Sequence, residues 1–298
     1  MKEKQKFGTG QLFNFAQGSY FERTSRPIYA VVFLLPFIAF YELGTILINK
    51  EVLTRYWQGR VVAFAWLERS LDYLGFGSKF AWVATPLAVI VILLALQVSS
   101  RKRWQIRYGD LWPMVIECIV FAVPLIVLGL YLNSPPKPQG DVAQFSSESI
   151  VSQIDDGAPS CSSVAGGNGG PRRPRLLADI VTGIGAGIYE ELVFRLILIC
   201  VLMMLFQDVL RLDHTNSIIV SVLVSAALFS AYHHIDFFSG QLYQRDPFSW
   251  TKFCFRTMAG VYFALLFAIR GFGITAGTHA FYDIIATCVN AFFFGAGN

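Results

Sequence analysis

Long apolar runs, separated by short polar segments, dominate the hydrophobic pattern of this chain. A helix that crosses the hydrocarbon core of a bilayer needs about 20 mainly apolar residues. Runs of this kind occupy positions 28–49, 81–98, 111–132, 217–238, 253–270 and 272–296. Each of these runs predicts a membrane-spanning helix.

A further apolar run, residues 176–210, is too long for a single upright span. It predicts either one steeply tilted helix or two segments that join near Arg195. Together with the other runs this gives seven or eight spans. Because only helices and closed barrels satisfy the backbone inside lipid, the pattern predicts an all-α, polytopic membrane bundle.

Three segments depart from the spanning pattern and divide the chain. Residues 1–27 are mostly polar and contain no signal peptide pattern, so we expect them to remain attached. Residues 61–76 place apolar side chains at helical spacing against charged ones, which favours an amphipathic helix in the membrane interface over a membrane span. Residues 133–175 are rich in Pro, Gly and Ser and predict a flexible loop. This loop separates a first set of spans, 28–132, from a second, 176–298.

The composition agrees with a membrane protein and excludes other classes. Charged residues make up 15% of the chain and hydrophobic residues 54%, whereas a soluble domain averages about 25% charged residues. The net charge of +4 gives no indication of nucleic-acid binding. The five cysteines show no CxxC spacing, so neither a disulfide framework nor a thiolate metal site is expected. The lipid bilayer is therefore the first partner that the sequence implies.

Positive charge gives a weak indication of orientation. Cytoplasmic loops carry an excess of Lys and Arg, although the connection 50–80 is also basic. We expect the N-terminus to be cytoplasmic because basic residues precede the first span and follow the second: Lys2, Lys4, Lys6, Arg23 and Arg26, then Arg101, Lys102, Arg103 and Arg107.

Two adjacent carboxylates, Glu190 and Glu191, interrupt the long apolar run, and Arg195 follows them. An ionisable residue at membrane depth is costly and usually has a function. Glu191 and Arg195 are four positions apart on a helix and can pair, whereas Glu190 points about 100° away. One glutamate can therefore hold the structure while the other serves as a general base. The alternative is a salt bridge that only fixes helix packing.

Two further polar clusters lie in later apolar runs. In FSAYHH, Phe229 and His233 share a helix face, and His234 points elsewhere, toward the interface. In THAFYD, His279 and Asp283 form another pair four residues apart, so the carboxylate can orient the imidazole. Either cluster could instead join two helices through hydrogen bonds.

If the three clusters converge, their polar side chains can bond to one another, which lowers the free-energy cost of burying them at membrane depth. A common pocket would then hold a base, an acid and oxyanion donors, which suffice to activate water against a peptide carbonyl. The Gly183–Gly187 spacing is the small-xxx-small pattern of close helix packing, which predicts that a neighbouring helix crosses close to Glu190.

The ordered motifs EExxxR at 190–195, FxxxH at 229–233 and HxxxD at 279–283 resemble those of the CPBP family. This family comprises CAAX prenyl proteases and bacteriocin-processing proteins, is related to the Rce1-type proteases and is often labelled Abi. The resemblance covers roughly residues 176–290 and leaves the first half without a recognisable motif.

The resemblance implies an intramembrane endopeptidase that cleaves a membrane-associated or lipid-anchored protein or peptide. It implies that Glu190 activates the hydrolytic water with help from His233, and that His279 and Asp283 support the oxyanion or orient the site. Glu191 and Arg195 would hold these groups together. Family members more often carry Asn at the position of Asp283, and an ionised Asp cannot donate to an oxyanion.

The resemblance leaves two mechanisms open. Members have been called metalloproteases, and Glu190, His233 and His279 offer nitrogen and oxygen ligands for zinc. A glutamic mechanism, in which a carboxylate and a histidine activate water without a cofactor, is favoured here because no HExxH motif is present. The resemblance also implies an integral protein of a bacterial inner membrane.

Two functions from other classes compete with the protease. A proton-coupled transporter would use Glu42 and Glu117 as well, and would show inverted repeats, which are not evident in this sequence. A non-catalytic scaffold would use the same pocket to bind a partner helix, although every motif residue is intact.

Overall fold

The computed structural model describes residues 15–48, 62–73, 75, 77–133, 172–236, 241–242 and 249–294. Most of the predicted loop 133–175 and the first 14 residues therefore lie outside the described residues. Within them the fold is helical, apart from the antiparallel pair β1 (Ile235–Asp236) and β2 (Gln241–Leu242). The predicted all-α membrane bundle is confirmed.

The first half contributes helices that begin and end close to the predicted apolar runs. The predicted span 28–49 is α2, whose first helical residue is a proline, where a missing amide hydrogen costs nothing. The elements are α1 (Tyr20–Thr24), α2 (Pro27–Leu47), α4 (Val62–Tyr73), α5 (Gly77–Ser100), η1 (Tyr108–Asp110) and α6 (Leu111–Asn133).

The second half begins with one continuous helical stretch that runs from residue 172 to residue 209. It contains π-helical turns but no break near Arg195, which favours the tilted helix over two joined segments. It starts inside the predicted loop, four residues before the apolar run. The elements are α8 (Arg172–Glu191), η2 (Leu192–Leu198), α9 (Ile199–Met203), η3 (Met204–Val209), α10 (His214–Tyr232), α11 (Trp250–Arg270), α12 (Phe272–Val289) and η4 (Asn290–Phe294).

Five helices of the described residues are long and apolar enough to cross a membrane, and a shorter apolar helix covers Ala84–Ser100. The helix α12, which the sequence also predicts as a span, is not among the five. It carries His279, Asp283 and several threonines at buried positions, so its polar side chains are enclosed by protein.

The predicted amphipathic helix is α4, and its first turn packs into the protein core. Ala63 and Phe64 are buried, and the Ala63 amide donates to the Tyr232 hydroxyl at the end of α10. The Phe64 ring also packs against Tyr189, beside Glu190. This helix therefore covers one side of the polar residues of α8.

The basic segments on either side of α2 and α5 lie together. A guanidinium nitrogen of Arg26, just before α2, lies 3.3 Å from the backbone oxygen of Arg103, just after α5. Arg23 also pairs with Asp110 at the start of α6, with a distance of 2.9 Å. The two basic clusters therefore lie on the same side of the helical bundle.

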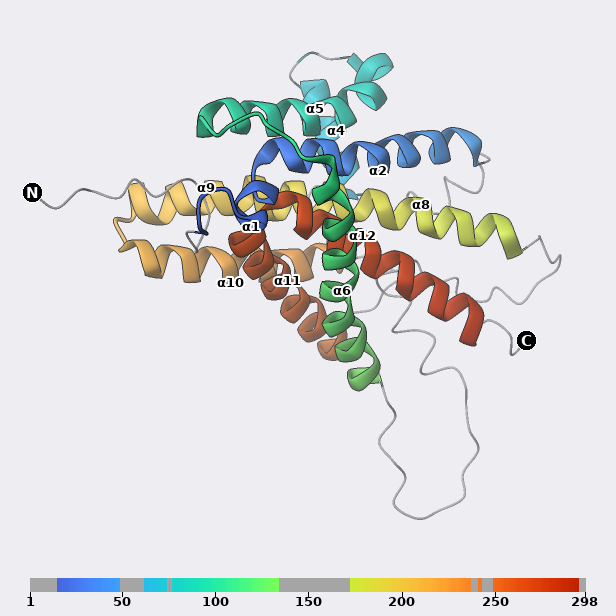
Figure 1. The fold of residues 1–298 in the computed structure, drawn as a ribbon. Helices are drawn as coiled ribbons and strands as arrows, with labels where there is room; N and C mark the ends of the chain where they lie inside the picture. The colour runs from blue at the N-terminus through green and yellow to red at the C-terminus, as the bar shows by residue number, and fades with distance from the viewer. Residues whose placement is uncertain are drawn as a thin grey trace, which may run out of the picture.

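In Figure 1 α2 runs alongside α8, α10 runs alongside α9, and α6 stands across the direction of these helices. The most extensive contacts join α12 to α8 and to α6, and α10 to α11. One apolar core spans both halves of the chain, because buried residues of α2, α5 and α6 cluster with those of α8 and α12. The first half thus forms part of the frame that holds the polar residues of the second.

Glycines bring α8 and α12 into direct contact. A Cβ atom at Gly183 would lie 2.7 Å from the Cβ atom of Asp283, and one at Gly187 would lie 2.6 Å from the Ala280 amide nitrogen. No side chain fits at these two positions. The sequence prediction that a helix crosses close to Glu190 is correct, and the crossing helix is the one that carries His279 and Asp283.

We expect Gly187→Ala to lower the free energy of unfolding by about 1–3 kcal/mol, because the added methyl group meets backbone atoms of α12 that cannot rotate away. Thermal unfolding of the purified protein in detergent measures this. The matched control is Gly129→Ala, where the new Cβ would be 3.7 Å from the Phe255 ring. This ordinary contact should leave stability unchanged or slightly raised. Equal stability of the two variants would contradict the close crossing.

Candidate active site

Glu190 and Glu191 form the last turn of α8, and Arg195 follows in the π-helical segment η2. All three side chains are buried. The Arg195 Nε atom lies 3.1 Å from a carboxylate oxygen of Glu191. The guanidinium also lies over the Phe229 ring, with its central carbon 4.2 Å from the ring centroid. The predicted pairing of Glu191 with Arg195 is therefore present and leaves Glu190 outside that pair.

His279, on α12, connects the two glutamates. Its Nδ1 atom lies 2.7 Å from a Glu191 oxygen, a hydrogen bond that fixes the ring. Its Nε2 atom lies 3.9 Å from Glu190 and 3.9 Å from Asp283. The Phe263 ring stacks on the imidazole, with ring centroids 4.6 Å apart. His279 is thus held by an anion on one edge and an aromatic ring on one face.

His233 caps the C-terminus of α10 and faces Glu190 from another side. Its Nδ1 atom lies 2.8 Å from the backbone oxygen of Phe229. A carbonyl oxygen can only accept, so Nδ1 is the donor, and in the neutral ring Nε2 carries a free electron pair. This Nε2 atom lies 4.0 Å from the Glu190 carboxylate. The His233 side chain keeps 19% of its surface exposed, more than the other groups of the cluster.

The structure brings together all the side chains that the sequence motifs single out. Two further residues, His234 and Phe263, differ from what the sequence predicts. His234 does not point toward the interface, because it is buried and its Nε2 atom lies 3.4 Å from a guanidinium nitrogen of Arg256. Phe263, which stacks on His279, was not predicted, since nothing distinguishes it from its apolar neighbours. The polar cluster consists of Glu190, Glu191, Arg195, His233, His279 and Asp283.

Comparison with known families agrees with this geometry. Residues 172–285 match the family model described as Type II CAAX prenyl endopeptidase Rce1-like. This segment contains the whole polar cluster and the three motifs. Residues 172–285 are thus similar to the Rce1-like family. The resemblance based on the motifs is thereby confirmed.

No curated protein and no solved structure matches the chain. The Rce1-like match supports a membrane-embedded peptidase of the CAAX type in general terms. The predicted division of the chain into a first set of spans and a catalytic set stays a prediction.

The part of the chain that the structure describes contains no arrangement of side chains that would bind zinc. Among these residues, no three His, Cys, Asp or Glu side chains are arranged so that they could hold a metal ion. These residues therefore give no support to the metalloprotease interpretation.

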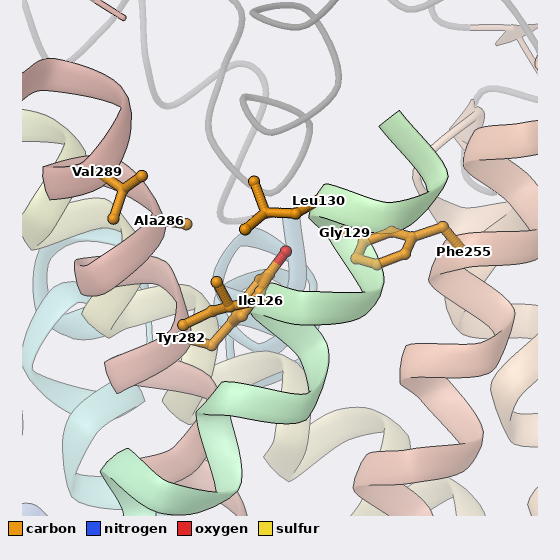
Figure 2. Close-up of a pocket in the computed structure, with 7 residues that line it drawn as sticks. All are labelled: Ile126, Gly129, Leu130, Phe255, Tyr282, Ala286 and Val289. Carbon is orange, nitrogen blue, oxygen red and sulfur yellow. The ribbon is translucent and has the colours of Figure 1, made fainter. Parts of the chain in front are cut away.

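An apolar groove opens between α6, α11 and α12 (Figure 2) and encloses about 340 Å³, part of it open to the exterior. Apart from the hydroxyl of Tyr282, its lining is hydrocarbon or aromatic, so it suits an alkyl chain and not a hydrolytic reaction. The lining residues are Ile126, Gly129 and Leu130 of α6, Phe255 of α11, and Tyr282, Ala286 and Val289 of α12.

One of the two carboxylates that a transporter would use, Glu117, has its own partners outside the polar cluster. Glu117 of α6 forms a short ion pair with Arg270, with a distance of 2.5 Å, and accepts a hydrogen bond from Tyr20. Arg270 also donates to Thr24. This network joins α1, α6 and the end of α11, so Glu117 has a partner that accounts for its presence.

Proposed function

We propose that this protein is an intramembrane endopeptidase that hydrolyses a peptide bond of a membrane-associated or lipid-anchored substrate. One observation carries the proposal. The Nε2 atoms of His233 and His279 both face the Glu190 carboxylate, at 4.0 and 3.9 Å. These distances exceed those of direct hydrogen bonds, and polar groups so separated are commonly bridged by water. A water molecule between them would touch a base and two imidazoles.

In the proposed reaction this water attacks the carbonyl carbon of the substrate while one of its protons passes to Glu190. The free electron pair on Nε2 of His233 can accept that proton next, or share it. The C–N bond then breaks, and the proton moves to the leaving nitrogen. The products are a new carboxyl group and a new amine, and no external oxidant, reductant or cofactor is needed.

The negative charge that develops on the carbonyl oxygen requires a donor. His279 can supply one from Nε2 when its ring is protonated, since Glu191 holds its other edge. Asp283 can supply one only as the neutral acid. We therefore propose His279 as the oxyanion donor and assign Asp283 to the orientation of His279. Glu191 and Arg195 keep the imidazole in place.

The scaffold alternative explains this geometry less well. A docking groove for a partner helix needs an apolar surface, and six polar side chains in contact would only weaken it. We also propose that the basic face that contains Arg26 and Arg103 is cytoplasmic, in a bacterial inner membrane. The substrate would approach within the bilayer.

The test uses the full chain in proteoliposomes with a library of membrane-anchored peptides. We expect cleavage products in which the new carboxyl group carries ¹⁸O when the reaction is run in H₂¹⁸O, and no loss of rate with a chelator. His233→Gln should abolish the products, because the amide cannot accept and return the proton. The control His214→Gln alters an exposed histidine at the other end of α10 and should retain them. Binding of peptides without any cleavage would favour the scaffold.

A further inference from the structure

The π-helical segment η2, Leu192–Leu198, lies directly after the two glutamates. A π turn contains an extra residue, which disturbs the regular backbone ladder, and such turns are frequent at functional sites. Buried backbone carbonyls need partners. Here the Ser225 hydroxyl, from α10, donates to the backbone oxygen of Phe194 over 2.8 Å. Both residues are buried, with 1% and 2% of their surfaces exposed.

This hydrogen bond acts next to the residue that holds the site together. Arg195 follows Phe194, and its guanidinium meets Glu191 at 3.1 Å. Glu191 in turn holds the Nδ1 atom of His279 at 2.7 Å. The position of the backbone at Phe194 and Arg195 therefore sets where the guanidinium lies relative to Glu191.

We propose that Ser225 is a positioning residue, whose hydroxyl holds the backbone oxygen of Phe194 and thereby keeps the neighbouring Arg195 against Glu191, which fixes His279. The inference rests on the proposed peptidase function for its kinetic consequence. Its structural consequence can be measured without any cleavage. Ser225 itself lies behind the π turn and acts through other residues.

Neighbouring serines provide a matched comparison. Ser217, Ser221 and Ser225 recur every four residues along one face of α10, and all are buried. Ser217 donates to the backbone oxygen of Asp213, at the start of its own helix. Among the described residues, the Ser221 hydroxyl has no hydrogen-bond partner. If the serines served only as small residues for helix packing, Ser221 and Ser225 would respond alike to substitution by alanine.

The kinetic test compares Ser225→Ala with Ser221→Ala in the reconstituted full chain. We expect kcat to fall roughly 10- to 100-fold in Ser225→Ala with KM unchanged, since small misplacements at a site cost up to about 10²-fold. Ser221→Ala should keep the wild-type kcat. Thr and Val have the same shape and differ by one hydroxyl, so Ser225→Thr should retain activity and Ser225→Val should lose it.

The structural test follows the histidine signals of protein labelled with ¹⁵N-histidine in lipid nanodiscs, which is feasible because the chain has four histidines. The Nδ1 proton of His279, bonded to Glu191, should appear far downfield in the wild type, Ser221→Ala and Ser225→Thr, and shift in Ser225→Ala and Ser225→Val. An unshifted signal in these last two variants would overturn the proposal, even if the wild type cleaves no peptide. If both fail to accumulate while Ser225→Thr accumulates, the hydroxyl serves folding and the positioning role is wrong.

Discussion

Replacing Glu190 with Gln should lower the rate of peptide cleavage about 10²–10⁴-fold, the contribution typical of a positioned general base. The amide has the same shape as the carboxylate but cannot take a proton from water. Glu190 lies 3.9 Å or more from the imidazoles of His233 and His279. The substitution therefore removes no direct hydrogen bond to either ring, and the amount of folded protein should stay close to that of the wild type. Cleavage of a fluorogenic peptide in proteoliposomes measures the rate.

The matched control is Glu42→Gln, which alters a partly buried carboxylate in the C-terminal part of α2, outside the polar cluster. It should retain cleavage. The same pair of variants separates the peptidase from a transporter, which would need Glu42 for proton coupling and would lose flux in this control. Full cleavage by the Glu190→Gln variant would exclude the proposed mechanism.

The sequence predicted the site well because its signals are local. Spacings of four residues placed Glu191 with Arg195, and His279 with Asp283, on shared helix faces, and each pair meets as expected. The membrane context then indicated convergence, because charged side chains are costly when they face lipid. The apolar runs predicted most helices for the same reason, since lipid demands a fixed length of apolar sequence.

Other features of the site depend on contacts between segments that are far apart in the sequence, and no local sequence pattern predicts them. His234 was expected to face the interface, but α11 supplies Arg256 as a neighbour and buries it. The stacking of Phe263 on His279 joins α11 to α12 within a uniformly apolar run. The backbone of the π turn after Glu191 accepts a hydrogen bond from the Ser225 hydroxyl of another helix. No periodicity in the run 176–210 marks that turn.

These contacts explain why a buried ionic cluster persists at membrane depth. Glu191 meets both a guanidinium and an imidazole, so its charge is balanced twice. Arg195 gains further stabilisation from the Phe229 ring below it. Glu190 makes no direct hydrogen bond to either imidazole, so its carboxylate is available to bind and activate water. The ion pair of Glu191 with Arg195 thus leaves Glu190 free to react.

Arg195→Met should destabilise the protein by about 3–5 kcal/mol, the cost of removing one partner of a buried ion pair. Arg195 and Glu191 have only 1% and 0% of their side-chain surfaces exposed, so water cannot replace the lost charge. Thermal or denaturant unfolding in detergent measures the effect. Arg103→Met is the control, because Arg103 is exposed and gives Arg26 only its backbone oxygen. It should change stability by less than about 0.5 kcal/mol.

A double variant tests whether Arg195→Met loses stability because the Glu191 carboxylate is left without its charged partner. Glu191→Gln keeps an oxygen that can accept from Nδ1 of His279 but carries no charge. Combined with Arg195→Met it should therefore be more stable than Arg195→Met alone, with a coupling of about 0.5–3 kcal/mol between the two positions. Additive effects would mean that Arg195 stabilises the fold through its packing on Phe229 and not through its charge, and the role assigned to the buried pair would then be wrong.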